Sequence, residues 1–472
     1  MRGATLYGCG VAQPYISRSL HAGALVLRRF LYLPFMRSSS QNSALSLRVL
    51  CTILCCLYVA PSVQAQERTD SLATRQDSAS VARVTAVADS SMAPPDSVGA
   101  KEAHPQDSPV NRGFRIRTVD GNAELRIRGS VRLNGIVDFK GLQSQSTFNT
   151  YDIPVADANS SDMRYAMYAG QTRLGLEAIQ KAGFGDIFTK VETDFLGLSN
   201  TLRLRHAYAS VYRFLFGQTW STFADLTAIP LTVDLDGPNG SVSERTVQIR
   251  YSNRFSDHLS WDASIESPNL EVTMPESLKT GTTFQSFPDV VGRIRESGGW
   301  GHFQLAGVLR SIRTNVFGSS QGQVPRVGYG LLVSGRIYLG GETPHRILFE
   351  LVAGKAVSRY IGTLARKGLD VVYDPVTGSV ELIPTFGGYF SYARQWTPNL
   401  LTYVTGGFVR VGNVESQPPD AFRFSRYVSG NLFWDVAPGT RLGAEYSWGV
   451  RQNKDYAHGT ASRISFILMY DF

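Results

Sequence analysis

The stretch AELRIRGSVRLNGIVDF, residues 123–139, alternates between two chemically different sets of side chains. Every second residue from Leu125 to Phe139 is apolar or glycine, and the residues between them are charged or polar except for Ile136. A period of two residues is that of a β-strand, in which successive side chains point to opposite faces. Strands of globular proteins usually have ~5–6 residues. The stretch therefore predicts an unusually long strand with one apolar face and one charged face.

Residues 464–472, ISFILMYDF, show the same alternation, and their apolar face is rich in aromatic side chains. A β-barrel in a lipid bilayer has no free edge, because its last strand pairs with its first. Its lipid-facing side chains are apolar, with aromatic residues at the interfaces. We therefore expect Phe466, Tyr470 and Phe472 to face lipid on a closing strand. The alternative is a buried terminal strand of a soluble domain.

The lengths of the connections between strands favour the membrane barrel. Short connections, such as AGFG at 182–185 and TPN at 397–399, alternate with long ones, such as 140–170 and 220–243. Short turns on one side and long loops on the other are typical of outer-membrane β-barrels, whose turns face the periplasm. Sixteen strands are predicted, near 123–139, 171–181, 186–196, 202–212, 214–219, 244–255, 257–267, 289–296, 299–310, 325–339, 344–356, 381–395, 398–412, 421–435, 439–451 and 459–472. The predicted fold class for residues 113–472 is thus an all-β, transmembrane antiparallel β-barrel of about 16 strands, with both ends in the periplasm.

Composition excludes two other classes of protein. After residue 65 there is no apolar run of the ~20 residues that a membrane-spanning helix needs. The net charge of +8 suggests a nucleic-acid partner, but residues 1–65 contain six Arg and no acidic residue. Residues 66–472 therefore carry 41 basic and 39 acidic side chains, a net charge of only +2. The basic character belongs to the leader, and no nucleic-acid partner is expected.

Residues 1–65 are predicted to be a signal peptide. The apolar run VLCTILCCLYVA at 49–60 is too short to span a bilayer, and the small residues before Gln66 are typical of a cleavage site after Ala65. Translation is expected to start at Met36, because residues 1–35 are unusually long for the start of a signal peptide. A lipoprotein signal is the alternative, but it needs a small residue before the acylated cysteine. All four cysteines lie in this leader, so the mature chain has no thiol for a disulfide, a metal or a nucleophile: Cys9, Cys51, Cys55 and Cys56.

Residues 66–112 are predicted to form a disordered extension in the periplasm. They are rich in Ser, Ala, Asp and Gln, contain several prolines, and have scarcely any aromatic residue. Such a segment cannot bury enough apolar surface to offset the loss of chain entropy. A short coiled coil is the alternative, although the segment shows no sustained heptad.

The segments ETDFLG, LRLRHAYASV, FGQTWSTFADL, TVDLDGPNG and RTVQIRY, between residues 192 and 251, resemble the central region of the DcaP-like outer-membrane porins. The resemblance implies a trimeric sixteen-stranded barrel that passes small anionic solutes, including dicarboxylates, by passive diffusion. It also implies an N-terminal periplasmic extension, often a coiled coil, from which the prolines of this chain depart. A strand that ends in Phe resembles the signal read by the barrel-assembly machinery, so Phe466, Tyr470 and Phe472 are candidate assembly residues.

The lumen is predicted to be lined with arginine. Residues 113–472 contain 29 Arg and 7 Lys, and alternation directs many of these arginines inward. Arg stays charged and matches a carboxylate with two parallel hydrogen bonds. The alternative is that these arginines pair with inward acids and only hold the wall in shape. A third possibility, for arginines that point outward such as Arg426, is contact with lipid of the outer leaflet. The candidate pore-lining arginines are Arg126, Arg128, Arg132, Arg203, Arg205 and Arg250, with Arg173, Lys190, Arg254, Arg310, Arg336 and Arg441 also inward, opposed by Glu177, Glu192, Asp194 and Glu445.

The long loop at 220–243 is expected to fold into the lumen and narrow it. Its apolar content is high for an exposed loop, which favours packing against the wall. Asp234 and Asp236 would then face the arginines across a constriction. The sequence DLDG at 234–237 is similar to the start of a calcium loop but lacks its remaining ligands, so no metal and no cofactor is expected.

An enzymatic function has little support in the sequence. The histidines after the leader are scattered, and neither HExxH nor Gly-x-Ser-x-Gly occurs. A barrel lipase or protease would need His206, whose alternation points outward, beside a Ser or Asp at the rim. An outer-membrane barrel enzyme and a non-transporting structural or adhesive barrel remain the alternatives to a porin.

Overall fold

The computed structural model describes residues 113–139, 142, 144, 146–155, 163–273, 285, 287–312, 326–340, 345–374 and 380–472. The predicted signal peptide at 1–65 and the extension at 66–112 lie outside these residues. No helix in the described segments is long and apolar enough to cross a membrane.

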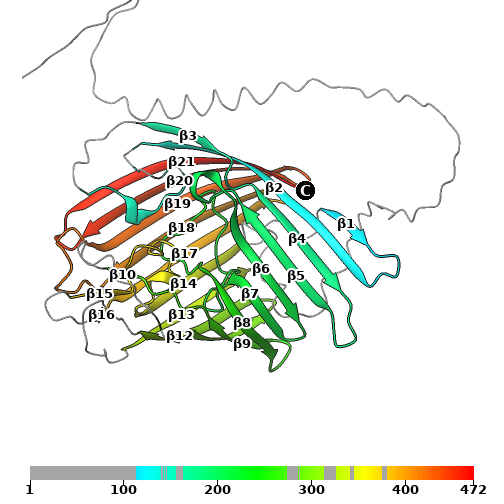
Figure 1. Ribbon diagram of the computed structural model, residues 1–472. Coiled ribbons are helices and arrows are strands. Elements are labelled where there is room, and N and C mark those ends of the chain that lie inside the picture. Colours follow the sequence, from blue (N-terminus) through cyan, green and yellow to red (C-terminus); the bar gives the residue numbers. More distant parts are fainter. Residues whose placement is uncertain are drawn as a thin grey trace, which may run out of the picture. The chain divides into compact units, whose positions relative to one another are not determined.

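The prediction of an antiparallel β-barrel is confirmed. Eighteen strands form one sheet in which neighbouring strands pair antiparallel, and β2 pairs with β21 to close it (Figure 1). All sixteen predicted strands are present: β2 (Ala123–Asp138), β4 (Arg173–Gln180), β5 (Ile187–Asp194), β6 (Arg203–Val211), β7 (Phe214–Trp220), β8 (Arg245–Arg254), β9 (Leu259–Glu266), β11 (Asp289–Gly298), β12 (Gly301–Ile312), β13 (Arg326–Leu339), β14 (His345–Lys355), β17 (Pro384–Thr397), β18 (Leu400–Val411), β19 (Phe422–Ala437), β20 (Thr440–Asn453) and β21 (His458–Asp471).

The two remaining strands of the sheet extend existing positions. β3 (Arg164–Tyr168) pairs with the second half of β2, and β4 pairs with its first half, so β3 and β4 lie end to end. β1 (Phe114–Arg117) pairs with the start of β2 on the side where β21 pairs with its end. The eighteen strands therefore occupy sixteen positions around the described barrel. The sequence did not predict β1 or β3.

The barrel closes at a contact between Phe472 and Gly129. The backbone groups of these two residues exchange two hydrogen bonds of 3.0 Å. The Phe472 ring occupies the space that a Cβ atom at position 129 would take. Tyr470 and Leu468, on the same face of β21, are about half exposed on the outside of the barrel. The closing strand thus presents its apolar face outward, as lipid requires.

Much of the described lumen is filled by chain segments from the long loops. The third long loop, at 221–244, and the segment at 356–374 pack together against the inner wall. Phe223 and Tyr360, one from each segment, meet edge to face with ring centroids 5.4 Å apart, and both are fully buried. Inward side chains such as Val308 of β12 and Leu332 of β13 complete this apolar cluster. The inward course of the third loop agrees with the prediction, and that of the segment at 356–374 was not predicted.

Short elements organise the loops. β15 (Val371–Tyr373) pairs in parallel with β10 (Val272–Thr273) and antiparallel with β16 (Val380–Leu382), forming a second, three-stranded sheet. Single 3-10 turns occur at η1 (Thr150–Asp152), η2 (Leu198–Asn200) and η4 (Ser358–Tyr360).

Candidate functional site

The inner wall formed by β2, β4, β5 and β6 carries rows of alternating charge. Arg126 lies opposite Glu177, which lies opposite Lys190 on the next strand. Two inward rows further along the barrel, Arg173 lies opposite Asp194, which lies opposite Arg203. The cross-strand register therefore places basic and acidic side chains next to one another, where they attract.

These charges form a continuous chain of ion pairs. Glu177 pairs with Arg128, and Lys190 Nζ lies 3.8 Å from Glu177 and 3.1 Å from Glu192. Arg205 joins Glu192 at 2.8 Å and Asp194 at 3.1 Å. Asp194 also accepts two hydrogen bonds from Arg203, of 2.9 and 2.7 Å. Most guanidinium charge in this wall is thus compensated by carboxylates.

A β-bulge at Arg205 corrects the predicted orientation of His206. In the pairing of β5 with β6, Glu192 lies opposite His206 and Thr193 lies opposite Leu204, so Arg205 is the extra residue. An extra residue reverses the alternation beyond it. His206 therefore faces inward, is 3% exposed, and lies 3.0 Å from the Thr219 hydroxyl through its Nδ1 atom. This position removes it from the lipid-facing surface on which a barrel lipase would need it.

The third loop is anchored to the wall by a buried carboxylate. Asp225 lies 2.7 Å from Arg295 and 2.8 Å from His302, and the Ser334 hydroxyl donates to it at 2.7 Å. These partners belong to β11, β12 and β13. Although burial alone would raise the pKa of Asp225, the Arg295 charge and the other partners hold it well below its usual value.

The far end of the same loop packs on the opposite wall through glycines. A Cβ atom at Gly407 would overlap the carbonyl oxygen of Asn239, and one at Gly240 would overlap the backbone of Gly388. Asn239 also donates to the Ser425 hydroxyl at 2.8 Å. The loop therefore crosses the lumen from β11–β13 to β17–β19 and is fixed at both ends.

Asp234 and Asp236 occupy different places on this loop. Asp234 is 3% exposed and accepts a hydrogen bond from the Phe148 amide at 2.6 Å. Its neighbour Val233 donates its amide to Glu445 of β20 at 3.0 Å, so Asp234 lies away from the arginines of β6. Burial, together with the charge of Asp236, raises the pKa of Asp234 to about 8. Asp236 faces the arginine side of the lumen, and burial raises its pKa as well.

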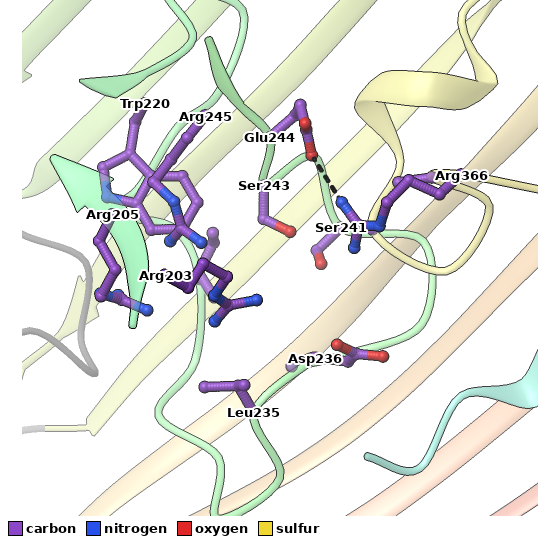
Figure 2. Close-up of a pocket in the computed structure, with 14 residues that line it drawn as sticks. Arg203, Arg205, Trp220, Leu235, Asp236, Ser241, Ser243, Glu244, Arg245 and Arg366 are labelled. Carbon is purple, nitrogen blue, oxygen red and sulfur yellow. Dashed lines mark ion pairs between the residues drawn. The ribbon is translucent and has the colours of Figure 1, made fainter. Parts of the chain in front are cut away.

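A narrow cleft of about 90 Å³ lies between the wall and the loops (Figure 2). Arg203 and Arg205 of β6 and Arg245 at the start of β8 lie on one side, where Arg245 stacks 4.5 Å above the Trp220 ring. Glu244 lies 3.8 Å from Arg366, whose side chain is 74% exposed. Burial raises the pKa of Glu244 above its usual value. The cleft therefore brings together four guanidinium groups and two carboxylates of reduced acidity.

Three of the predicted pore-lining residues, Arg203, Arg205 and Asp236, line this cleft. Arg126 bonds with Glu124, Arg132 bonds with Ser130 at 2.9 Å, and Arg250 donates to Gln248 at 3.0 Å and to the Trp220 carbonyl. These three and Arg128 belong to the inner wall outside the cleft.

The sequence analysis missed Arg245 and Arg366. Arg245 has the alternation opposite to that of the inward Arg250, and Arg366 lies in a loop without periodicity. No group of three or more His, Cys, Asp and Glu in the described residues could hold a metal ion.

Comparisons with known proteins identify what this barrel is similar to. The family model "DcaP outer membrane protein" matches residues 114–472. The crystal structure of the outer membrane channel DcaP of Acinetobacter baumannii is similar with a TM-score of 0.65 and 20% identity, over 76% of this chain and 99% of that one. An anion-selective porin from Comamonas acidovorans is similar with a TM-score of 0.49 and 11% identity, over 74% and 100% of the two chains. No curated protein matches in sequence.

Proposed function

Because this chain belongs to the DcaP outer membrane protein family, whose model covers its entire barrel, we propose that it is a porin for small organic anions. Solutes would cross the outer membrane by passive diffusion along the arginine side of the lumen. The cleft beside Arg203, Arg245 and Arg366 would be the narrowest part of that route.

The charge of the cleft carries this proposal. The lining contains four arginines and two carboxylates, Asp236 and Glu244, and both carboxylates have raised pKa values. Arg203 and Arg205 are also paired with Asp194 and Glu192 of the wall, so the charge of the cleft depends mainly on Arg245, Arg366 and the two lining carboxylates. A raised pKa lowers the fraction of the carboxylate that is charged at a given pH. The cleft therefore has an excess of positive charge, and a narrow site of low dielectric strengthens the attraction of that charge for an anion.

The arginines of the cleft would have different roles. Arg203 keeps about a third of its side chain exposed, and Arg366 is largely exposed, so both can contact a solute. Arg205 is 2% exposed and compensates Glu192 and Asp194. We assign Arg203, Arg245 and Arg366 to solute binding and Arg205 to holding the wall. Of the predicted arginines that line the cleft, Arg203 would thus bind solute and Arg205 would be structural.

A non-transporting structural or adhesive barrel is the second candidate, and the segments that fill the lumen favour it. Single-channel recording in a planar bilayer separates the two functions. The proposed porin gives discrete conductance steps and, in a salt gradient, a reversal potential of the sign set by anions. A barrel without steps would be a structural one, and a cation-selective wild type would refute the proposed solute class.

We also propose that the chain forms a homotrimer, as the family resemblance implies. Light scattering of the detergent-solubilised protein, with the detergent mass subtracted, measures the number of chains directly. A monomer in several mild detergents would contradict the proposal without affecting the proposed pore of each barrel.

A further inference from the structure

The outer surface of the barrel has an apolar groove over β14 and β17–β20. Its volume is about 780 Å³, and its lining includes Leu351, Phe390, Phe408, Val428 and Trp448, with Gly406 among them. Leu351, Phe390 and Val428 are about half exposed, and their alternation directs them outward. The groove therefore lies on the face of the barrel that lipid covers.

Two arginines stand at one end of this groove. Arg426 lies opposite Phe408, and Arg410 lies opposite Phe424, so the two arginines are diagonal neighbours on β18 and β19. Diagonal neighbours are ~7–8 Å apart, which is close enough for one phosphate to contact both. Both side chains are exposed on the outer surface. Neither has an ion pair with the described carboxylates, and Arg426 lies 5.6 Å from the centroid of the Phe424 ring.

The height of these arginines on β18 and β19 matches the upper boundary of the membrane. Trp434 is an exposed aromatic side chain near the periplasmic end of this strand. A strand rises ~3.3 Å per residue, and a tilt of ~40° reduces the vertical rise to ~2.5 Å. Arg426 is eight residues from Trp434 and therefore stands ~20 Å above it, and Arg410, opposite Phe424, stands ~25 Å above it. The apolar band of an outer-membrane barrel is ~25 Å tall, so both arginines lie near its upper edge. The groove below them lies in the outer leaflet.

We propose that this groove binds lipid A, the phosphorylated and multiply acylated anchor of lipopolysaccharide in the outer leaflet. One acyl chain would lie in the groove, in contact with Phe390 and Val428. A glucosamine phosphate would bind Arg410 and Arg426, whose guanidinium groups recognise phosphate through charge-assisted hydrogen bonds. A second copy of this chain is the other possible occupant, but an apolar interface between copies would leave both arginines without an anionic partner.

The glycine at the groove provides a sharp test. A Cβ atom at Gly406 meets nothing within 4 Å, so Gly406→Leu fills the groove without disturbing the wall. Gly430 on β19 also has open space around it but does not line the groove, so Gly430→Leu is the matched control. Arg410→Gln/Arg426→Gln removes the phosphate site, and Arg254→Gln is its control, because Arg254 is the exposed last residue of β8 and does not line the groove.

Native mass spectrometry of the delipidated full chain, titrated with diphosphoryl lipid A, dephosphorylated lipid A or phosphatidylglycerol, measures binding. We expect each arginine to contribute about tenfold to the affinity for diphosphoryl lipid A. The double arginine variant should therefore bind it about a hundredfold more weakly, because two charge-assisted contacts are lost. Gly406→Leu should weaken all lipid A binding, and neither control should change it. Equal affinity for phosphatidylglycerol, or unchanged binding by both groove variants, would overturn the proposal. Dissociation of an oligomer by Gly406→Leu would identify the groove as an interface between copies, and would also overturn it.

Discussion

Replacing Arg203 and Arg366 together by Gln should remove most of the anion preference of the pore. The lining of the cleft holds four arginines and two carboxylates, and the double substitution removes two of the four positive charges. It also takes from Asp194 its two hydrogen bonds with Arg203, which leaves more negative charge beside the cleft. Exposed ion pairs contribute ~0.2–1 kcal/mol, and hydrogen bonds to charged groups ~1.5–3 kcal/mol. Arg203 is one-third exposed and Arg366 three-quarters exposed.

These exposures set the magnitude for each arginine. We assign about 1 kcal/mol to the contact of an anion with Arg203 and about 0.5 kcal/mol to that with Arg366, after discounting for solvent screening. The two losses together correspond to roughly a tenfold fall in the anion-to-cation permeability ratio.

The reversal potential across a planar bilayer in a tenfold KCl gradient measures this ratio. Arg213→Gln is a suitable control, because Arg213 lies in the turn between β6 and β7, outside the cleft. A ratio within twofold of the wild-type value would refute the argument that the cleft sets selectivity. Normal folding of the variant is shown by unchanged heat resistance on gel electrophoresis.

The remaining predictions concern the inner wall, the third loop and the contact between Phe472 and Gly129. Arg205→Gln should destabilise the barrel by about 3–5 kcal/mol, because Glu192 and Asp194 lose a buried partner. Urea unfolding measures this loss, and adding Glu192→Gln should restore part of it. An unchanged unfolding midpoint would contradict a structural role for Arg205. Anion preference should fall as the pH rises, because Asp236 and Glu244 have raised pKa values and become charged late. The stability due to protonated Asp234 should be fully present below its ordinary pKa, fall as the pH rises above it, and be lost once the pH passes about 8. Reversal potentials and unfolding midpoints that do not vary between pH 5 and 9 would argue against both statements. Gly129→Leu should impair assembly as much as deletion of Phe472 does, because the leucine side chain would displace the Phe472 ring. The amount of heat-resistant protein in outer membranes measures assembly. Normal levels of both variants would show that the contact between Phe472 and Gly129 is dispensable.

The strands were predictable from the sequence because membrane strands alternate strictly. Leu125 and Arg126 must face lipid and lumen respectively, and a slip of one residue would reverse both. Bulges break this rule locally, and the one at Arg205 shows why His206 was assigned to the wrong face. The pairing of β5 with β6 that reveals it depends on the neighbouring strand, not on the sequence of β6 alone.

The cleft was less predictable than the wall. Arg203 and Arg205 could be found because they lie on a strand with clear alternation. Arg366 has a positive φ of 64° in a loop, and its place beside Glu244 depends on how the segment at 356–374 enters the lumen. Asp234 and Asp236 were both expected to face the arginines because the loop folds inward, but an irregular loop does not keep side chains two residues apart on one side.

The apolar cluster inside the lumen also bears on how this barrel responds to heat. A pore filled only with water and polar side chains has little apolar surface to expose there, so detaching its loops changes the heat capacity little. Here Phe223, Leu332 and Tyr360 are fully buried within the lumen. Releasing the loops would therefore hydrate apolar surface while the strands remain in the bilayer. Calorimetry of such a protein should show a positive heat-capacity step of the kind that soluble domains give, separate from the melting of the barrel itself.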